Sequence, residues 1–270
     1  PSALSMGADL TIQSTHKVLG AMTQASMLHW QGNRINPQRI SQALQLVEST
    51  SPSYILLASL DAARQQMALQ GKELISQTLQ LATMARSKLA EIPHISVLEF
   101  APQPGFTHLD STRLTINISR LGMTGYEADE ILHQQLGVTC ELPLLNHLTF
   151  IISLGNTEAD INKLIRGFRT LSESSPTSSA YPVSLAPTAS LAPMSPREAF
   201  FAPKESIPIT ESRNRICGES ICPYPPGIPV LMPGEIITSE AIDYLQQVLN
   251  SGGIITGCSD PTLKTISVIS

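Results

Sequence analysis

Residues 13 to 24, QSTHKVLGAMTQ, place an amine directly between a polar turn and an apolar run. A lysine that forms a Schiff base must spend part of its time as a neutral amine. Burial against apolar side chains favours that form, because it penalises the ammonium. The residues that follow Lys17 and could supply such a wall are Val18, Leu19, Ala21 and Met22.

The side chains before Lys17 suit a phosphate group. Ser14, Thr15 and His16 carry hydroxyl and imidazole groups, which can donate hydrogen bonds to phosphate oxygens. A cofactor with both an aldehyde and a phosphate would use the amine and these donors together, and pyridoxal phosphate is such a cofactor. The alternative for Lys17 taken alone is an ordinary solvated surface charge.

Composition excludes several classes of protein. Apolar residues make up 42% of the 270 residues and charged residues 14%, which is typical of a globular protein and not of a disordered one. The net charge is −5 and the sequence has no basic run, so nucleic acid is not an expected partner. We expect no membrane span, since no stretch of about 18 apolar residues occurs.

Cysteine and histidine spacing gives no sign of a metal or disulfide framework. The four cysteines follow neither zinc-site nor CxxC spacing, and the histidines lie in different predicted elements. Reduced thiols and the absence of a recognisable signal peptide favour a cytoplasmic protein. The cysteines are Cys140, Cys217, Cys222 and Cys258.

Hydrophobic periodicity predicts alternating helices and strands, and hence an α/β or α+β protein. A brief strand is expected at 10–13, followed by a helix that carries Lys17 and continues through the apolar run after it, ending before His29. Further helices are expected over 37–48, from the end of the STSPSY loop at 49–54 to Pro93, over 124–136, 157–169 and 239–249. Strands are expected at 95–100, 113–119, 138–142, 147–155 and near the end in TISVIS.

Four segments of the sequence resemble the Orn/Lys/Arg decarboxylase family, a group of fold type I pyridoxal-phosphate enzymes. They are GADLTIQSTHKVLGAMTQASMLH (7–29), STSPSYILLASLDAAR (49–64), PYPPGIPVLMPGE (223–235) and GGIITGCSDPTLKTISV (252–268). These blocks follow the family's order, so the resemblance covers most of the chain.

The resemblance implies an α/β fold of type I with a separate C-terminal domain. The expected division is residues 1–93 as the C-terminal part of the cofactor-binding large domain and 94–170 as a small α/β domain. A Ser/Pro-rich linker over 171–195 precedes a C-terminal decarboxylase domain over 196–270.

The resemblance also implies an activity and a set of site residues. Lys17 matches the lysine that holds pyridoxal 5′-phosphate as an internal aldimine, and Ser14 and His16 match positions that contact the phosphate. The reaction would convert arginine, lysine or ornithine to the corresponding amine and CO2, with Lys17 as a reasonable proton donor to Cα. We expect a homodimer or higher homo-oligomer, in which the STSPSY loop reaches the neighbouring subunit's cofactor.

Glu235 is a candidate for binding the cationic tail of the substrate. It ends a loop that five prolines and two glycines make rigid, and a carboxylate can pair with an amine or guanidinium. The alternative is that Glu235 caps the next helix, near Thr238 or Ser239. Glu219 is a weaker candidate of the same kind.

Part of the family's site lies upstream of its cofactor lysine. The acid that pairs with the pyridine nitrogen and the histidine that stacks on the ring would both precede Pro1, so this chain alone is expected to be an incomplete decarboxylase. Two alternatives stay open. One is a different fold type I enzyme such as an aminotransferase, and the other is a truncated homologue that binds or regulates a complete subunit.

Overall fold

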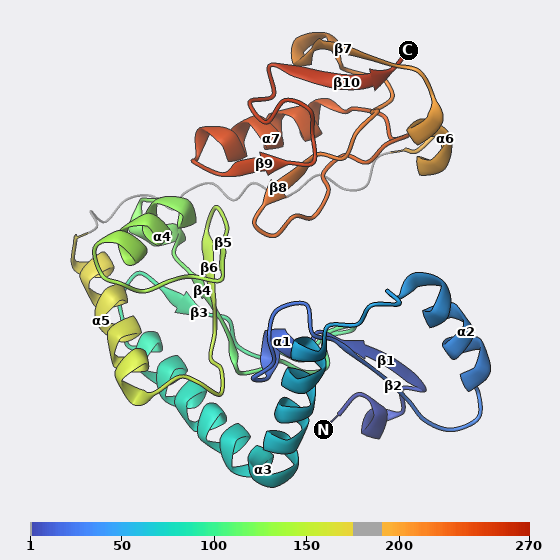
Figure 1. Cartoon of the computed structure of the whole chain (residues 1–270). Coiled ribbons are helices and arrows are strands. Elements are labelled where there is room, and N and C mark those ends of the chain that lie inside the picture. The colour runs from blue at the N-terminus through green and yellow to red at the C-terminus, as the bar shows by residue number, and fades with distance from the viewer. Residues whose placement is uncertain (1, 175–190) are drawn as a thin grey trace. The chain divides into compact units, whose positions relative to one another are not determined.

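The computed structural model describes residues 2–174 and 191–270, and the chain divides into two compact units (Figure 1). The first unit comprises residues 1–82 and 152–157, and the second comprises 83–151 and 158–270. Most of the predicted linker, residues 175–190, lies outside the described part. None of the described helices is both long and apolar enough to cross a bilayer.

The first unit contains a two-stranded antiparallel sheet, the helices α1 and α2, and most of the long helix α3. The helix predicted over 37–48 is confirmed, because Pro37 occupies its first turn and the Asn36 side chain accepts a hydrogen bond from the Gln38 N–H. The long helix predicted after the STSPSY loop is confirmed as well. The elements are η1 (Leu4–Met6), β1 (Leu10–Gln13), α1 (Thr15–Val18), β2 (Met27–Trp30), α2 (Pro37–Val47) and α3 (Tyr54–Ala90).

The prediction of a longer helix after Lys17 is wrong. Helix α1 ends at Val18, Leu19 has an extended backbone, and the chain then returns through a loop to β2. The loop is held against α3, because the Met22 N–H donates to the Ser59 hydroxyl. A contact with a residue 37 positions away thus overrides the local helical pattern.

The second unit begins with a four-stranded antiparallel sheet in the order β3-β4-β6-β5. Strands β4 and β6 lie within two of the predicted strand segments, and their residues alternate between buried and partly exposed positions. The strands expected at 95–100 and 138–142 are much shorter, since only Ser96–Val97 and Leu142–Pro143 find partners. The elements are β3 (Ser96–Val97), β4 (Arg113–Asn117), η2 (Ser119–Leu121), α4 (Gly125–Gln134), β5 (Leu142–Pro143), β6 (His147–Ile151) and α5 (Glu158–Ser174).

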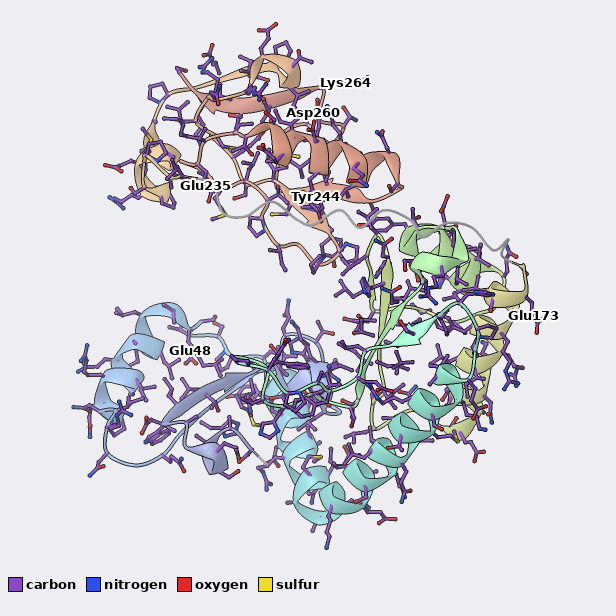
Figure 2. All side chains as sticks on the ribbon, turned by 180° about the vertical axis from the view of Figure 1, so that it is seen from behind. Glu48, Glu173, Glu235, Tyr244, Asp260 and Lys264 are labelled. Carbon is purple, nitrogen blue, oxygen red and sulfur yellow. The ribbon has the colours of Figure 1, made fainter. Side chains whose placement is uncertain are left out.

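Helix α5 and the last turns of α3 lie side by side in both views (Figures 1 and 2). The Ser172 hydroxyl donates to the Pro93 carbonyl at 2.7 Å and joins α5 to the segment that follows α3. The core beside the sheet combines buried side chains from both helices and from β4 and β6. These include Ala85, Leu89, Leu114, Ile116, Leu148, Ile161 and Phe168.

Helix α4 begins as the sequence predicted, with a complete capping box. Thr124 accepts from the Glu127 N–H, and the Glu127 carboxylate accepts from the Thr124 N–H at 2.7 Å. Gly125 is required here, because a Cβ at this position would lie 1.9 Å from the Leu144 carbonyl oxygen. This close approach brings the start of α4 against the β5–β6 turn.

The C-terminal part has its own core, which includes Leu231, Ile237, Leu245, Ile255 and Val268. The predicted strand TISVIS and the helix at 239–249 are both confirmed. Strand β10 pairs antiparallel with β7, and β8 pairs antiparallel with β9. The elements are α6 (Pro196–Phe201), β7 (Lys204–Pro208), η3 (Ile209–Glu211), β8 (Cys222–Tyr224), α7 (Ser239–Asn250), β9 (Ile254–Thr256) and β10 (Thr265–Ile269).

Candidate active site

Lys17 lies on the loop that connects β1 to β2. Gln13 and Met27 are the last paired residues, so residues 14–26 form a loop that starts with the single turn α1. Ser14 has an extended backbone and its carbonyl accepts from the Lys17 N–H at 3.1 Å, while the Thr15 carbonyl accepts from the Leu19 N–H at 2.9 Å. Ser14, His16 and Lys17 are thereby brought together on one turn.

The imidazole of His16 is fixed by a backbone carbonyl. The Ala25 oxygen lies 2.8 Å from His16 Nδ1 and also accepts from the His16 N–H at 3.3 Å. Because a carbonyl only accepts, Nδ1 carries the proton and Nε2 is left for another partner. Sequence reasoning missed this role of Ala25, since a carbonyl nine residues away has no signature of its own.

The three hydroxyl groups around the turn have different roles. Thr15 is buried and its hydroxyl donates to the Gln13 carbonyl at 3.5 Å, and the Ser26 hydroxyl donates to the same oxygen at 3.0 Å. The Ser14 hydroxyl is exposed and has no hydrogen-bond partner among the described residues. Ser14 is therefore the hydroxyl that remains available to a ligand.

Lys17 is exposed, and its amine makes no hydrogen bond or ion pair within residues 2–174 and 191–270. The expected apolar wall does not form within this part of the chain, because Val18 and Met22 are each about half exposed. The reason is the early end of α1, which turns these side chains away from a common helical face.

Glu235 belongs to the second unit and lies shortly before α7 (Figure 2). Its Oε2 accepts from the Met232 N–H at 2.8 Å, so the carboxylate closes its own turn. Helix α7 is capped by Thr238, whose hydroxyl accepts from the Ala241 N–H at 3.2 Å, and not by Glu235. No hydrogen bond from the described residues reaches Oε1, which leaves that oxygen open to a cation.

Glu219, the weaker candidate, holds two backbone segments together. Its Oε1 accepts from the Ser267 N–H at 2.9 Å, and its Oε2 accepts from the Ser259 N–H at 2.8 Å. Both oxygens are therefore occupied, which makes Glu219 a structural residue that joins β10 to the preceding loop.

The two buried cysteines, Cys140 and Cys217, are packing residues with unreactive thiols. Burial raises the pKa of Cys140 to about 12 and that of Cys217 to about 11, so both stay protonated at neutral pH. All four thiols are free, as the sequence predicted.

Asp260 organises the turn before β10, on which Lys264 also lies (Figure 2). The Thr262 hydroxyl and the Thr265 and Thr262 N–H groups donate to its carboxylate and hold its pKa well below the usual range. A depressed pKa stabilises the folded state above the unfolded-state value of about 3.9, and this contribution is lost as the pH falls toward the folded-state value.

Asp260→Asn is therefore expected to lower the melting temperature at pH 7, where the carboxylate is charged in both states. The difference from the unaltered protein should shrink as the pH falls below about 4. Thermal unfolding followed by circular dichroism between pH 3 and 8 measures this difference in melting temperature. A difference that stays constant over this range would contradict the assignment.

The donor set on α1 fits pyridoxal phosphate. An amine, a hydroxyl and an imidazole nitrogen can together bind an aldehyde that bears a phosphate. All three lie on one turn here, and none of them has a partner among the described residues. This match rests on the chemistry of Lys17, Ser14 and His16.

Two family models match the chain. The Orn/Lys/Arg decarboxylase major domain matches residues 2–114, and the Orn/Lys/Arg decarboxylase C-terminal domain matches residues 179–257. The chain belongs to the Orn/Lys/Arg decarboxylase family. This family consists of pyridoxal-phosphate-dependent decarboxylases of basic amino acids.

Relatives within the Orn/Lys/Arg decarboxylase family include two named arginine decarboxylases. The one from Bacillus anthracis is 35% identical over 273 residues, covering 99% of this chain and 55% of the relative. The one from Bacillus subtilis is 36% identical over 274 residues, covering 99% of this chain and 56% of the relative. The chain thus spans about half the length of these relatives.

Solved structures of the family confirm the fold. The constitutive lysine decarboxylase of Escherichia coli matches with a TM-score of 0.76 at 20% identity. A lysine decarboxylase of Francisella novicida matches with a TM-score of 0.75 at 23% identity. Each match covers 97% of this chain and 49% of the other. The mixed α/β fold therefore matches part of fold type I lysine decarboxylase structures together with a C-terminal decarboxylase domain.

Proposed function

We propose that this chain is the part of a decarboxylase that supplies the cofactor lysine, and that the substrate of the complete protein is arginine. The observation that carries the proposal is the free amine of Lys17, on one turn with the free Ser14 hydroxyl and the oriented His16 imidazole. Arginine is favoured over lysine and ornithine because the relatives at 34–36% identity are named arginine decarboxylases.

Each residue of the turn has a separate task. Lys17 would hold the aldehyde carbon of pyridoxal phosphate, and the Ser14 hydroxyl and His16 Nε2 would contact its phosphate. When bound, this cofactor withdraws electrons from the substrate Cα, so that the carboxylate can leave as CO2. His16 donates at Nε2 only as the imidazolium, since Nδ1 is committed to the Ala25 carbonyl.

Lys17 is also our candidate for the proton donor. After CO2 leaves, Cα needs a proton, and a lysine freed from the aldehyde is an ammonium at the required position. Its exposure among the described residues keeps the amine accessible to both tasks. Glu235 Oε1 is the candidate for the guanidinium of the substrate, on the strength of its free lone pairs.

A homodimer is proposed on the basis of exposed apolar side chains. Leu46 and Val47 at the end of α2 and Tyr54 and Ile55 at the start of α3 are between 68% and 87% exposed. They flank the STSPSY loop, and contact with a second subunit would remove them from water. The division into domains after residues 93, 170 and 195 stays a proposal.

The substrate assignment is tested with the complete protein, by measuring amine and CO2 release from arginine, lysine and ornithine in parallel. We expect the highest kcat/KM for arginine. Release of a keto acid in place of CO2 would instead favour an aminotransferase.

Ser14→Ala is expected to weaken cofactor binding roughly ten- to hundredfold, because it removes one hydrogen bond to a charged phosphate. Titration of the apoprotein with pyridoxal phosphate, followed by visible absorption, measures the affinity. Ser26→Ala is the matched control, since that hydroxyl is already committed to the Gln13 carbonyl. Equal affinity of the two variants would contradict the role of Ser14.

A further inference from the structure

An open cavity lies wholly within the second unit, between the end of α3 and the segments around β3. Its volume is about 360 Å³, which is the size of a site for a small molecule. It is lined by Thr83, Arg86, Ser87, Ala90, Val97, Glu99 and Ser111.

Arg86 lines this cavity and carries an unpaired buried donor. Its Nη2 donates to the Leu98 carbonyl, whereas its Nη1 is buried and has no partner within the described residues. An arginine stays charged at any physiological pH, so it cannot relieve the cost of burial by losing its proton. A buried charged donor without an acceptor is unfavourable, and an anionic group at Nη1 would remove that cost.

Glu99 brings the opposite charge to the same cavity. Its carboxylate is exposed and forms neither a hydrogen bond nor an ion pair with any described residue, including Arg86. The two charges are therefore not in direct contact. The cavity therefore offers one cation and one anion at two different points.

We propose that this cavity binds an α-amino acid through its zwitterionic head group. The carboxylate would accept from Arg86 Nη1, and the ammonium would pair with Glu99. The hydroxyls of Ser87 and Ser111 also line the cavity and can complete the hydrogen bonding. A phosphate fits less well, since Glu99 would repel a dianion.

The proposal does not depend on Lys17 or on the cofactor. It makes the cavity a second amino-acid site, which shares no residue with the turn that carries Ser14, His16 and Lys17. Its failure and the failure of the proposed function are separable, because the binding experiment uses a chain in which Lys17 is replaced.

The test is equilibrium dialysis of radiolabelled L-arginine against the full chain carrying Lys17→Ala. We expect saturable binding that L-alanine displaces, because alanine has the same head group. Agmatine, which lacks the carboxylate, and Nα-acetyl-L-arginine, which lacks the ammonium, should both fail to displace it.

Two variants test the assigned contacts. Arg86→Met should weaken L-arginine binding at least tenfold, and Glu99→Gln at least fivefold, whereas Arg120→Met, at an exposed arginine of the same unit, should bind as before. Glu99 is exposed, so its variant keeps the test valid if Arg86→Met fails to fold. Absence of saturable binding to the folded chain, displacement by agmatine, or unchanged affinity in Glu99→Gln would each overturn the proposal.

Discussion

Lys17→Ala is expected to lower kcat for decarboxylation by the complete protein at least about 10³-fold. The substitution removes both the amine that would hold the cofactor and the candidate proton donor for Cα. Both roles are assigned to the same atom, Lys17 Nζ, so no neighbouring residue can take them over. Steady-state CO2 release with saturating arginine and added pyridoxal phosphate measures the effect.

Lys72→Ala is the matched control, because Lys72 is an exposed lysine on α3. Its variant should keep the unaltered rate. A small primary amine such as methylamine should restore part of the activity of Lys17→Ala, which a purely structural role of Lys17 would not allow. Wild-type turnover in Lys17→Ala would rule out the assigned chemistry.

Phe168→Ala is expected to lower the free energy of unfolding by about 3–5 kcal/mol. Phe168 on α5 is fully buried, and its ring meets that of Phe150 on β6 edge to face, with 5.7 Å between centroids. The substitution leaves a cavity between helix and sheet that neighbouring side chains fill only in part. Urea unfolding followed by circular dichroism measures the loss.

Phe200→Ala removes the same atoms at a site that is 67% exposed. It should cost less than about 1 kcal/mol, since little apolar surface leaves the core. If the two variants unfold at similar urea concentrations, the core assigned to α5 and β6 is wrong.

Local signals explain which elements could be predicted from the sequence. Pro37 and Thr124 mark the starts of α2 and α4, and both helices depend on hydrogen bonds within three residues of these positions. The helix expected after Lys17 failed because Met22 is held by Ser59, a partner that only the folded chain brings close. Strands β3 and β5 were overestimated because strand length depends on the neighbouring strand and not on local pattern.

The candidate site likewise contains features that have a local sequence signal and features that depend on distant contacts. Ser14, His16 and Lys17 are almost contiguous, so residue type and order were enough to propose them. The carbonyl of Ala25 and the unpaired Nη1 of Arg86 were not foreseen. A signal for Arg86 did exist, because it lies four residues after the buried Ala82 and three before the buried Leu89, on the buried side of α3.

Borohydride reduction of the complete protein with pyridoxal phosphate, followed by peptide mass mapping, tests most directly whether Lys17 is the cofactor lysine. Reduction converts a covalent lysine–cofactor link into a stable pyridoxyl group. We predict one such group, on the peptide that contains Lys17. A pyridoxyl group on Lys72 or Lys88 instead, or none at all, would contradict the assignment of Lys17.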